Sequence, residues 1–128
     1  MKRITFAFAG CALVFLATSG LQAQTLPEGV TDTMVEEGST LFAGAGLCAV
    51  CHGPGGAGAI GPNLTDDEWF KGEGLFEEIV AQIMEGVAPA DAQNAFGAFM
   101  PPKGGATISD EQVRSVAAYV WTLSNGGD

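Results

Sequence analysis

The sequence predicts one all-α domain, in which three main helices are separated by two long loops. Three observations favour this class. Apolar residues recur at helical spacing in three segments, no segment alternates between apolar and polar residues as a strand would, and two glycine- and proline-rich stretches lie between the helical segments. The chain has 128 residues, enough for one domain, and 47% of them are hydrophobic, enough for a folded core.

Each helical segment has its own start signal or apolar stripe. We expect helices over residues 33–45, 75–87 and 109–125. A Ser or Thr followed three residues later by Glu or Gln has the spacing of a capping box. It occurs at Thr33/Glu36, at Ser109/Gln112 and at Thr65/Glu68, where it opens a short turn. Gly38 lies on the stripe of the first helix, where Gly costs ~1 kcal/mol relative to Ala. We attribute it to the close approach of another helix.

Residues 1–23 have the order of a secretory signal peptide. A short basic start precedes an apolar run of about 14 residues, and small and polar residues follow up to Ala23. Because a membrane span needs ~20 apolar residues, we expect cleavage after Ala23, with an uncleaved anchor as the alternative. Cys11 lies inside the apolar run, which favours a discarded segment over a lipoprotein site. The sequence therefore predicts a periplasmic protein, with the domain over residues 24–128.

The chain is strongly acidic. Five Lys and Arg residues against fifteen Asp and Glu residues give a formal charge of −10, and loss of residues 1–23 would take it to −12 by removing two cations. Binding to nucleic acid needs a basic face, so this balance argues against it. We expect protein partners with basic or neutral surfaces, no membrane span after cleavage, and a monomer.

The chemistry is carried by Cys48-Ala49-Val50-Cys51-His52 in the first long loop. C-x-x-C-H is the attachment pattern of a c-type haem, in which two thiols form thioethers with the vinyl groups and the following histidine can ligate the iron. A redox dithiol would need only the two cysteines, and a structural zinc site would need four ligands. Both alternatives fit the pattern less well. We therefore predict one haem c, covalently bound through Cys48 and Cys51, with His52 as an iron ligand.

Met100, in the second long loop, is predicted to be the other axial ligand. The chain has no second histidine, which excludes ligation by two histidines. Met34 and Met84 lie on helical apolar stripes, where core packing is the simpler explanation. A thioether ligand raises the reduction potential, and an iron with two protein ligands has no vacant position for a substrate. The alternatives are an open iron and ligation by Lys71 or Lys103.

These motifs resemble those of the class I cytochromes c, the small bacterial monohaem type, over the whole chain after residue 23. The residues that carry the resemblance are Gly38, Phe42, Cys48, Cys51, His52, Gly53, Gly61, Pro62, Asn63, Leu64, Met100, Pro101 and residues 116–120. Residues 62–67 and 118–124 look especially similar to the haem domains of the dihaem subunit of cbb3-type oxidases. The resemblance implies a small cytochrome c fold wrapped around one covalently attached haem.

The resemblance also implies roles for individual residues. The carbonyl of Pro62 would accept a hydrogen bond from the second ring nitrogen of His52, and Leu64 would pack on the haem. Trp69 would reach a haem propionate through its indole N–H, with burial against another partner as the alternative. At the crossing of the first and last helices, the expected contacts join Gly38 and Phe42 to Val116 and Tyr119.

The sequence therefore predicts an electron-transfer protein of a respiratory chain and not an enzyme. It would carry one electron between a donor dehydrogenase or quinol-oxidising complex and an acceptor oxidase or reductase. The alternative is a dedicated haem subunit of a dehydrogenase or oxidase complex, which a large exposed apolar patch would favour. A third hypothesis is a sensor or catalyst with an open iron.

Overall fold

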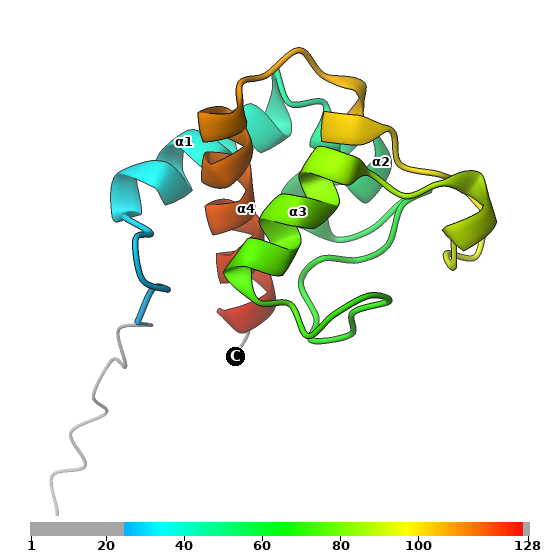
Figure 1. Cartoon of the computed structure of the whole chain (residues 1–128), viewed down its shortest axis with the longest axis horizontal. Coiled ribbons are helices and arrows are strands. Elements are labelled where there is room, and N and C mark those ends of the chain that lie inside the picture. Colours follow the sequence, from blue (N-terminus) through cyan, green and yellow to red (C-terminus); the bar gives the residue numbers. More distant parts are fainter. Residues whose placement is uncertain (1–24, 127–128) are drawn as a thin grey trace, which may run out of the picture.

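The computed structural model describes residues 25–126, in which four α-helices are connected by long loops (Figure 1). The helices are α1 (Asp32–Ala43), α2 (Cys48–His52), α3 (Phe76–Glu85) and α4 (Asp110–Asn125). Within these residues the strand-like pairing is limited to one isolated antiparallel bridge, between Val87 and Met100. The all-α class and its three main helices are confirmed. The predicted signal peptide and its cleavage site lie outside the described residues.

No helix in the described part of the chain is both long enough and apolar enough to cross a membrane.

The helices α1 and α4 cross at close range, and Gly38 permits the crossing. A Cβ atom at Gly38 would overlap the carbonyl oxygen of Ser115 and would lie 2.9 Å from the Cβ of Tyr119. One turn further along α1, Phe42 meets Tyr119 edge to face, with ring centroids 5.4 Å apart and planes at 68°. The predicted close approach at Gly38 is therefore present, and Ser115 is its nearest neighbour.

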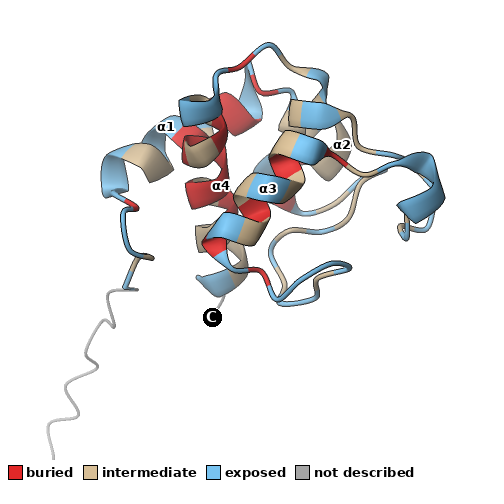
Figure 2. Ribbon diagram, viewed as in Figure 1, coloured by how far each residue is buried: buried red, intermediate tan, exposed pale blue. Residues whose placement is uncertain are grey.

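The core lies between α1, α3 and α4. Figure 2 shows buried residues along α4 and on one side of α3. The buried apolar side chains of these helices are Leu41, Phe42, Phe76, Ile79, Ile83, Val113, Val116, Ala117, Ala118 and Val120. At the surface, the Arg114 guanidinium donates to both carboxylate oxygens of Glu77, at 2.8 and 3.0 Å, and lies 4.9 Å from the ring centroid of Phe76. These contacts fix α3 against α4.

Polar side chains start two of the helices. Thr31, and not Thr33, caps α1, because its Oγ1 accepts the N–H of Met34 at 3.3 Å. The predicted capping pair at Thr33 is therefore wrong by two residues. The pair that starts α4 is confirmed, since the N–H of Gln112 donates to Ser109 Oγ at 3.1 Å and the N–H of Ser109 donates to Gln112 Oε1 at 2.9 Å.

The two long loops contain more structure than the sequence predicted. The first holds α2, and both loops contain 3₁₀ turns. The short turn predicted at Thr65/Glu68 is present, but the capping pair itself does not form. Instead, Asn63 Oδ1 accepts the N–H of Thr65 at 2.9 Å and Asp66 Oδ1 accepts the N–H of Glu68 at 3.2 Å, which makes two consecutive side-chain-closed turns. The 3₁₀ turns are Pro54–Gly56, Pro89–Asp91 and Pro102–Gly105.

Candidate haem site

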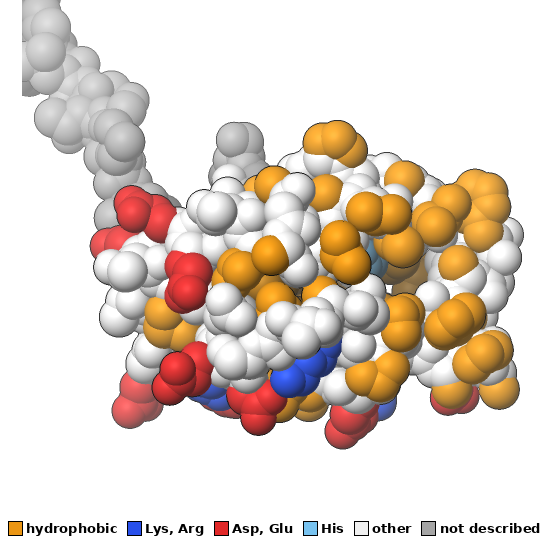
Figure 3. All heavy atoms as spheres, turned by 90° about the horizontal axis from the view of Figure 1, so that it is seen from above, with side chains coloured by type: hydrophobic (Ala, Val, Ile, Leu, Met, Phe, Trp, Pro, Cys, Tyr) orange, Lys and Arg blue, Asp and Glu red, His pale blue; other side chains and the backbone are white. Residues whose placement is uncertain are grey.

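A cavity of about 630 Å³ lies between the helices and the two long loops. One side of it is the apolar core, and the lining residues there are Phe42, Ile79, Ile83, Val116 and Val120. The volume lies within the ~300–1,000 Å³ that is usual for ligand sites. Figure 3 shows a histidine side chain in a hollow that is surrounded by hydrophobic side chains. The cavity therefore offers a large apolar group a site in contact with the core.

The predicted site residues converge on this cavity. Cys48, Cys51 and His52 line it from α2, and Met100 lines it from the second long loop. The remaining predicted residues that line the same cavity are Pro62, Leu64 and Trp69. Two thiols, one imidazole and one thioether thus line one cavity, and a covalently attached haem with histidine and methionine ligands would use all four.

The short helix α2 gives the Cys-x-x-Cys-His sequence its geometry. Leu47 precedes it in the left-handed region at φ 58°, and Gly53 follows it at φ 76°. Residues three and four positions apart lie on one face of a helix, so Cys51 and His52 both lie on the face of Cys48. Cys48 and Cys51 are free thiols and form no disulfide with each other.

The ring of His52 is oriented by a backbone carbonyl. Its Nδ1 lies 2.9 Å from the carbonyl oxygen of Pro62, and since a carbonyl only accepts, Nδ1 carries the proton. This leaves the lone pair of Nε2 free for a metal ion. Burial lowers the pKa of His52, and the hydrogen bond to Pro62 opposes that effect in part. The contact that the resemblance implied is present, and iron ligation by His52 stays a prediction.

The thiol of Cys48 is partly buried and lies 3.3 Å from the carbonyl oxygen of Gly46. Burial raises the pKa of this thiol, the charge of Cys51 acts in the same direction, and a hydrogen bond with the backbone of Cys48 itself opposes them in part. Redox dithiols need a thiolate and therefore a lowered pKa. The environment of Cys48 thus argues against the dithiol alternative.

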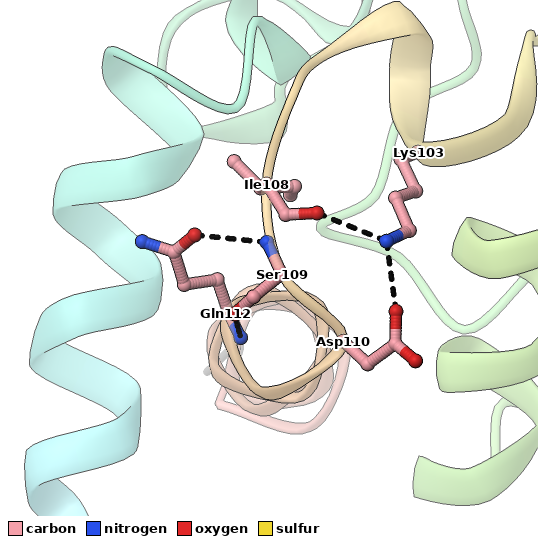
Figure 4. A network of polar contacts seen from close by, with 5 residues as sticks. All are labelled: Lys103, Ile108, Ser109, Asp110 and Gln112. Carbon is pink, nitrogen blue, oxygen red and sulfur yellow. Dashed lines mark hydrogen bonds and ion pairs between the residues drawn. The ribbon is translucent and has the colours of Figure 1, made fainter.

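Met100 is held on both sides along the chain. At Met100 itself, the isolated bridge joins the Met100 N–H to the Val87 carbonyl at 3.0 Å and the Met100 carbonyl to the Val87 N–H at 2.7 Å. After it, the Lys103 ammonium donates to the carbonyl of Ile108 at 2.9 Å and to Asp110 Oδ1 at 2.8 Å (Figure 4). The loop that carries Met100 is thus fastened to Val87, two residues after α3, and to the start of α4.

The other candidate ligands are less well placed than Met100. Lys103 is engaged at the start of α4 and does not line the cavity. Lys71 does line it, but its ammonium lies 3.8 Å from a carboxylate oxygen of Glu85. Among the methionines of residues 25–126, Met34 and Met84 pack against the core and only Met100 lines the cavity. Ligation by Met100 stays the prediction that the geometry favours.

Two predicted contacts concern the first loop and remain predictions. Leu64 is partly buried, and its N–H donates to the carbonyl of Gly56 at 2.7 Å. Trp69 is also partly buried, and its indole packs so closely on Gly74 that a Cβ there would overlap the ring. Both side chains are therefore firmly placed beside the cavity.

The sequence did not indicate α2 or the Val87–Met100 bridge. Five residues in a glycine-rich loop give no periodic signal for a helix. The bridge pairs two single residues with no strand pattern on either side. The one available signal was Gly86, since a glycine directly after a helix can adopt the positive φ that it has here.

Comparisons with known proteins agree with the cavity. Residues 33–120 match the family described as cytochrome C oxidase, cbb3-type, subunit III. The cbb3-type cytochrome c oxidase subunit FixPc of Rhizobium leguminosarum bv. viciae is 42% identical over 79 residues, which are 61% of this chain and 27% of that protein. The corresponding subunit CcoP of Rubrivivax gelatinosus is 39% identical over 88 residues, or 68% of this chain and 25% of that protein.

A solved structure supports the fold. Cytochrome CL from the marine methylotrophic bacterium Methylophaga aminisulfidivorans aligns with a TM-score of 0.50 and 26% identity, over 71% of this chain and 53% of that chain. The small cytochrome c fold is thereby confirmed. Together with the family match and the Cys48/Cys51 spacing, it establishes haem c as the cofactor.

Proposed function

Because the chain belongs to the family of subunit III of cbb3-type cytochrome C oxidase, we propose that it is a haem-carrying electron-transfer subunit of an oxidase complex. The haem supplies a one-electron iron couple. Cys48 and Cys51 would hold it covalently, and His52 and Met100 would ligate its iron. An iron with two protein ligands has no vacant position for a substrate, so such a site would transfer electrons and perform no bond chemistry.

One observation carries this proposal. Side chains from two separate parts of the chain, the α2 segment and Met100, line a single apolar cavity of about 630 Å³. Packing alone does not explain why two free thiols, a thioether and an imidazole share that space. The Nδ1–H of this imidazole is already hydrogen-bonded to the Pro62 carbonyl. Covalent attachment of a haem explains the two thiols, and ligation of its iron explains the imidazole and the thioether.

An exposed apolar lobe supports the subunit hypothesis over the freely diffusing carrier. Residues 88–99 contain a single charged side chain, Asp91, although the formal charge of the chain is −10. Phe96 in this lobe is 69% exposed and does not line the cavity, so the cofactor does not cover it. Asn94 holds the turn in place by accepting the N–H groups of Phe96 and Ala98, at 3.1 and 3.0 Å. Exposed, ordered apolar surface of this kind is typical of a protein interface.

The similarity to the oxidase subunits has a limited extent. The chain spans about a quarter of the length of the relatives described above, 27% and 25%. The proposal therefore concerns a haem domain. We propose that its partners are other oxidase subunits and their electron donor, and that it works on the periplasmic side, with residues 1–23 as export signal or anchor.

Absorption spectra of the exported protein test the haem assignment. Covalent haem should survive acid–organic extraction, and the reduced protein should show sharp low-spin bands. The ferric protein should show the weak long-wavelength sulfur-to-iron band of a thioether ligand. A high-spin spectrum would remove Met100 as ligand and favour the sensor or catalyst hypothesis. A colourless protein, made with the attachment machinery present, would contradict the proposal.

Affinity purification from the native host tests the subunit assignment. The tagged chain, extracted under mild conditions, should elute with terminal oxidase subunits and stain for haem on a denaturing gel. A Phe96→Ser variant should elute with less of these subunits at the same haem content. Elution of the wild type as a haem-containing monomer would favour the freely diffusing carrier.

A further inference from the structure

The end of α3 has an unusual backbone that is fastened to the helix itself. Gly86 follows the last residue of α3 with φ 74° and ψ −163°. Its N–H donates to the carbonyl of Gln82 at 2.8 Å, and its carbonyl accepts from the Gln82 side-chain amide at 2.6 Å. One residue of α3 therefore holds both polar backbone groups of Gly86, and this leaves Gly86 little freedom to move relative to the helix.

The chain segment around Met100 lies directly against Gly86. A Cβ atom at Gly86 would overlap the carbonyl oxygen of Met100 and would lie 2.8 Å from both the carbonyl carbon of Pro101 and the nitrogen of Pro102. All three are backbone atoms, which cannot rotate away as a side chain does. The next residue, Val87, then makes the two hydrogen bonds of the bridge with Met100.

The helix that carries Gly86 is itself fixed in the fold. Ile79 and Ile83 of α3 are buried, with exposures of 3% and 7%. Glu77 of the same helix forms the two-point ion pair with Arg114 of α4. The position of Gly86 relative to α4 and to the cavity is therefore set by the core, and a conflict at Gly86 falls on the Met100 segment.

We propose that Gly86 is a positioning residue for Met100: the absence of a side chain lets the Met100 backbone lie against the end of α3, and this contact sets where the thioether stands in the cavity. The inference rests on the proposed ligation by Met100. Metal–ligand distances hold to within ~0.2 Å, so a backbone shift large enough to admit a methyl group is enough to separate the ligand from the iron.

The test is Gly86→Ala in the full chain, made with the haem-attachment machinery. We expect covalent haem and far-UV circular dichroism as in the wild type, loss of the long-wavelength thioether band of the ferric protein, and a lower reduction potential. A positive φ strains any alanine, so the control must share that strain without the contact. Gly97→Ala provides it, because Gly97 lies in the same loop at φ 60° and a Cβ there meets nothing within 4 Å.

The outcomes separate the inference from the function on which it rests. If the wild type itself lacks the thioether band, the proposed ligation fails. If the wild type has the band and Gly86→Ala keeps it with an unchanged potential, only the role of Gly86 is overturned. Equal loss of the band in Gly97→Ala would overturn it too, since backbone strain would then be the cause.

A second variant decides the matter if Gly86→Ala does not accumulate. Gln82→Leu keeps the side-chain volume but removes the donor to the Gly86 carbonyl. We expect its thioether band to disappear on warming at a lower temperature than in the wild type, while global unfolding followed at the haem Soret band shifts less. Equal shifts of both transitions would overturn the proposal, because Gln82 would then act only on overall stability.

Discussion

Backbone groups, rather than neighbouring side chains, place the two predicted iron ligands. The Pro62 carbonyl fixes the proton and orientation of the His52 ring at 2.9 Å. The N–H and carbonyl of Val87 fix the backbone of Met100. Such contacts depend on the path of the chain and not on the identity of the side chains that supply them. The ligands themselves, in contrast, act through side-chain chemistry and respond directly to substitution.

Replacement of Met100 by leucine should remove the thioether while nearly conserving the side-chain volume. We expect the ferric protein to lose its long-wavelength band and the reduction potential to fall, because a soft thioether favours ferrous iron. Potentiometric titration followed by absorbance measures both. Met84→Leu is the matched control, since Met84 packs against the core and does not line the cavity. An unchanged band in Met100→Leu would show that another group ligates the iron.

Among the elements, the crossing of α1 and α4 depends most on a single position. Gly38→Ala would bring a methyl group into the carbonyl oxygen of Ser115. Its better helix propensity is worth ~1 kcal/mol, but overpacking against backbone costs ~1–3 kcal/mol and sometimes more. We expect a net loss of unfolding free energy in denaturant titrations. Glu36→Ala, at an exposed position of α1, should stay within ~0.5 kcal/mol of the wild type. A stabilised Gly38→Ala protein would contradict the close crossing.

The first turn of α3 makes stability depend on acid pH. Backbone hydrogen bonds from Glu73, at 2.8 Å, and Leu75, at 3.1 Å, lower the pKa of Glu78. A hydrogen bond from Arg114 lowers the pKa of Glu77. A carboxyl group with a lowered pKa stabilises the folded state above its unfolded pKa, ~4.3 for Glu, and that contribution is lost as the pH falls through the folded value.

We therefore expect the unfolding free energy to fall as the pH drops below ~4.3, where these carboxylates take up protons. Glu78→Gln should be less stable than the wild type at neutral pH, because an amide oxygen is a weaker acceptor than a carboxylate. The difference between the two should close in strong acid, where Glu78 of the wild type is itself neutral. Urea titrations at several pH values measure it. A difference that stays constant with pH would contradict this role of Glu78.

The sequence predicted the helices well and their connections poorly, and the reason is physical. Apolar periodicity marks α1, α3 and α4 because each buries one face. Capping pairs are less reliable. Thr31 accepts the N–H of Met34 and starts α1 two residues before Thr33, and the turn predicted at Thr65 is closed by Asn63 and Asp66 instead. The attachment motif was visible because its spacing is local. The Val87–Met100 bridge was not, because it pairs two single residues from separate parts of the chain and neither has a strand pattern around it.

At the scale of the whole molecule, the net surface charge is negative and hydrophobic side chains gather around the haem cavity. In the part of the chain that the structure describes, all three cationic side chains pair with carboxylates: Lys71 with Glu85, Lys103 with Asp110 and Arg114 with Glu77. The remaining carboxylates leave a net negative surface, while the cavity lies among hydrophobic side chains (Figure 3). A partner that approaches the haem thus meets apolar surface first and acidic surface around it. This arrangement favours partners whose apolar contact surface is surrounded by Lys and Arg residues.

The same cavity makes the fold depend on its cofactor. It borders the core residues of α1, α3 and α4, so its contents complete the packing of those helices. Left unfilled, the cavity would leave these apolar side chains in contact with water and without the packing that the haem supplies. A typical domain is stabilised by only ~5–15 kcal/mol, so the loss of that packing weighs heavily on the folded state.

We therefore expect the Cys48→Ala/Cys51→Ala double variant, which cannot bind haem covalently, to lack a cooperative thermal transition and to lose much of its far-UV helical signal. Met100→Leu is the control, because it keeps the covalent haem and should keep the transition. Circular dichroism of the two purified proteins at equal concentration makes the comparison. A haem-free double variant that unfolds cooperatively at the wild-type temperature would show that the three helices pack without the cofactor.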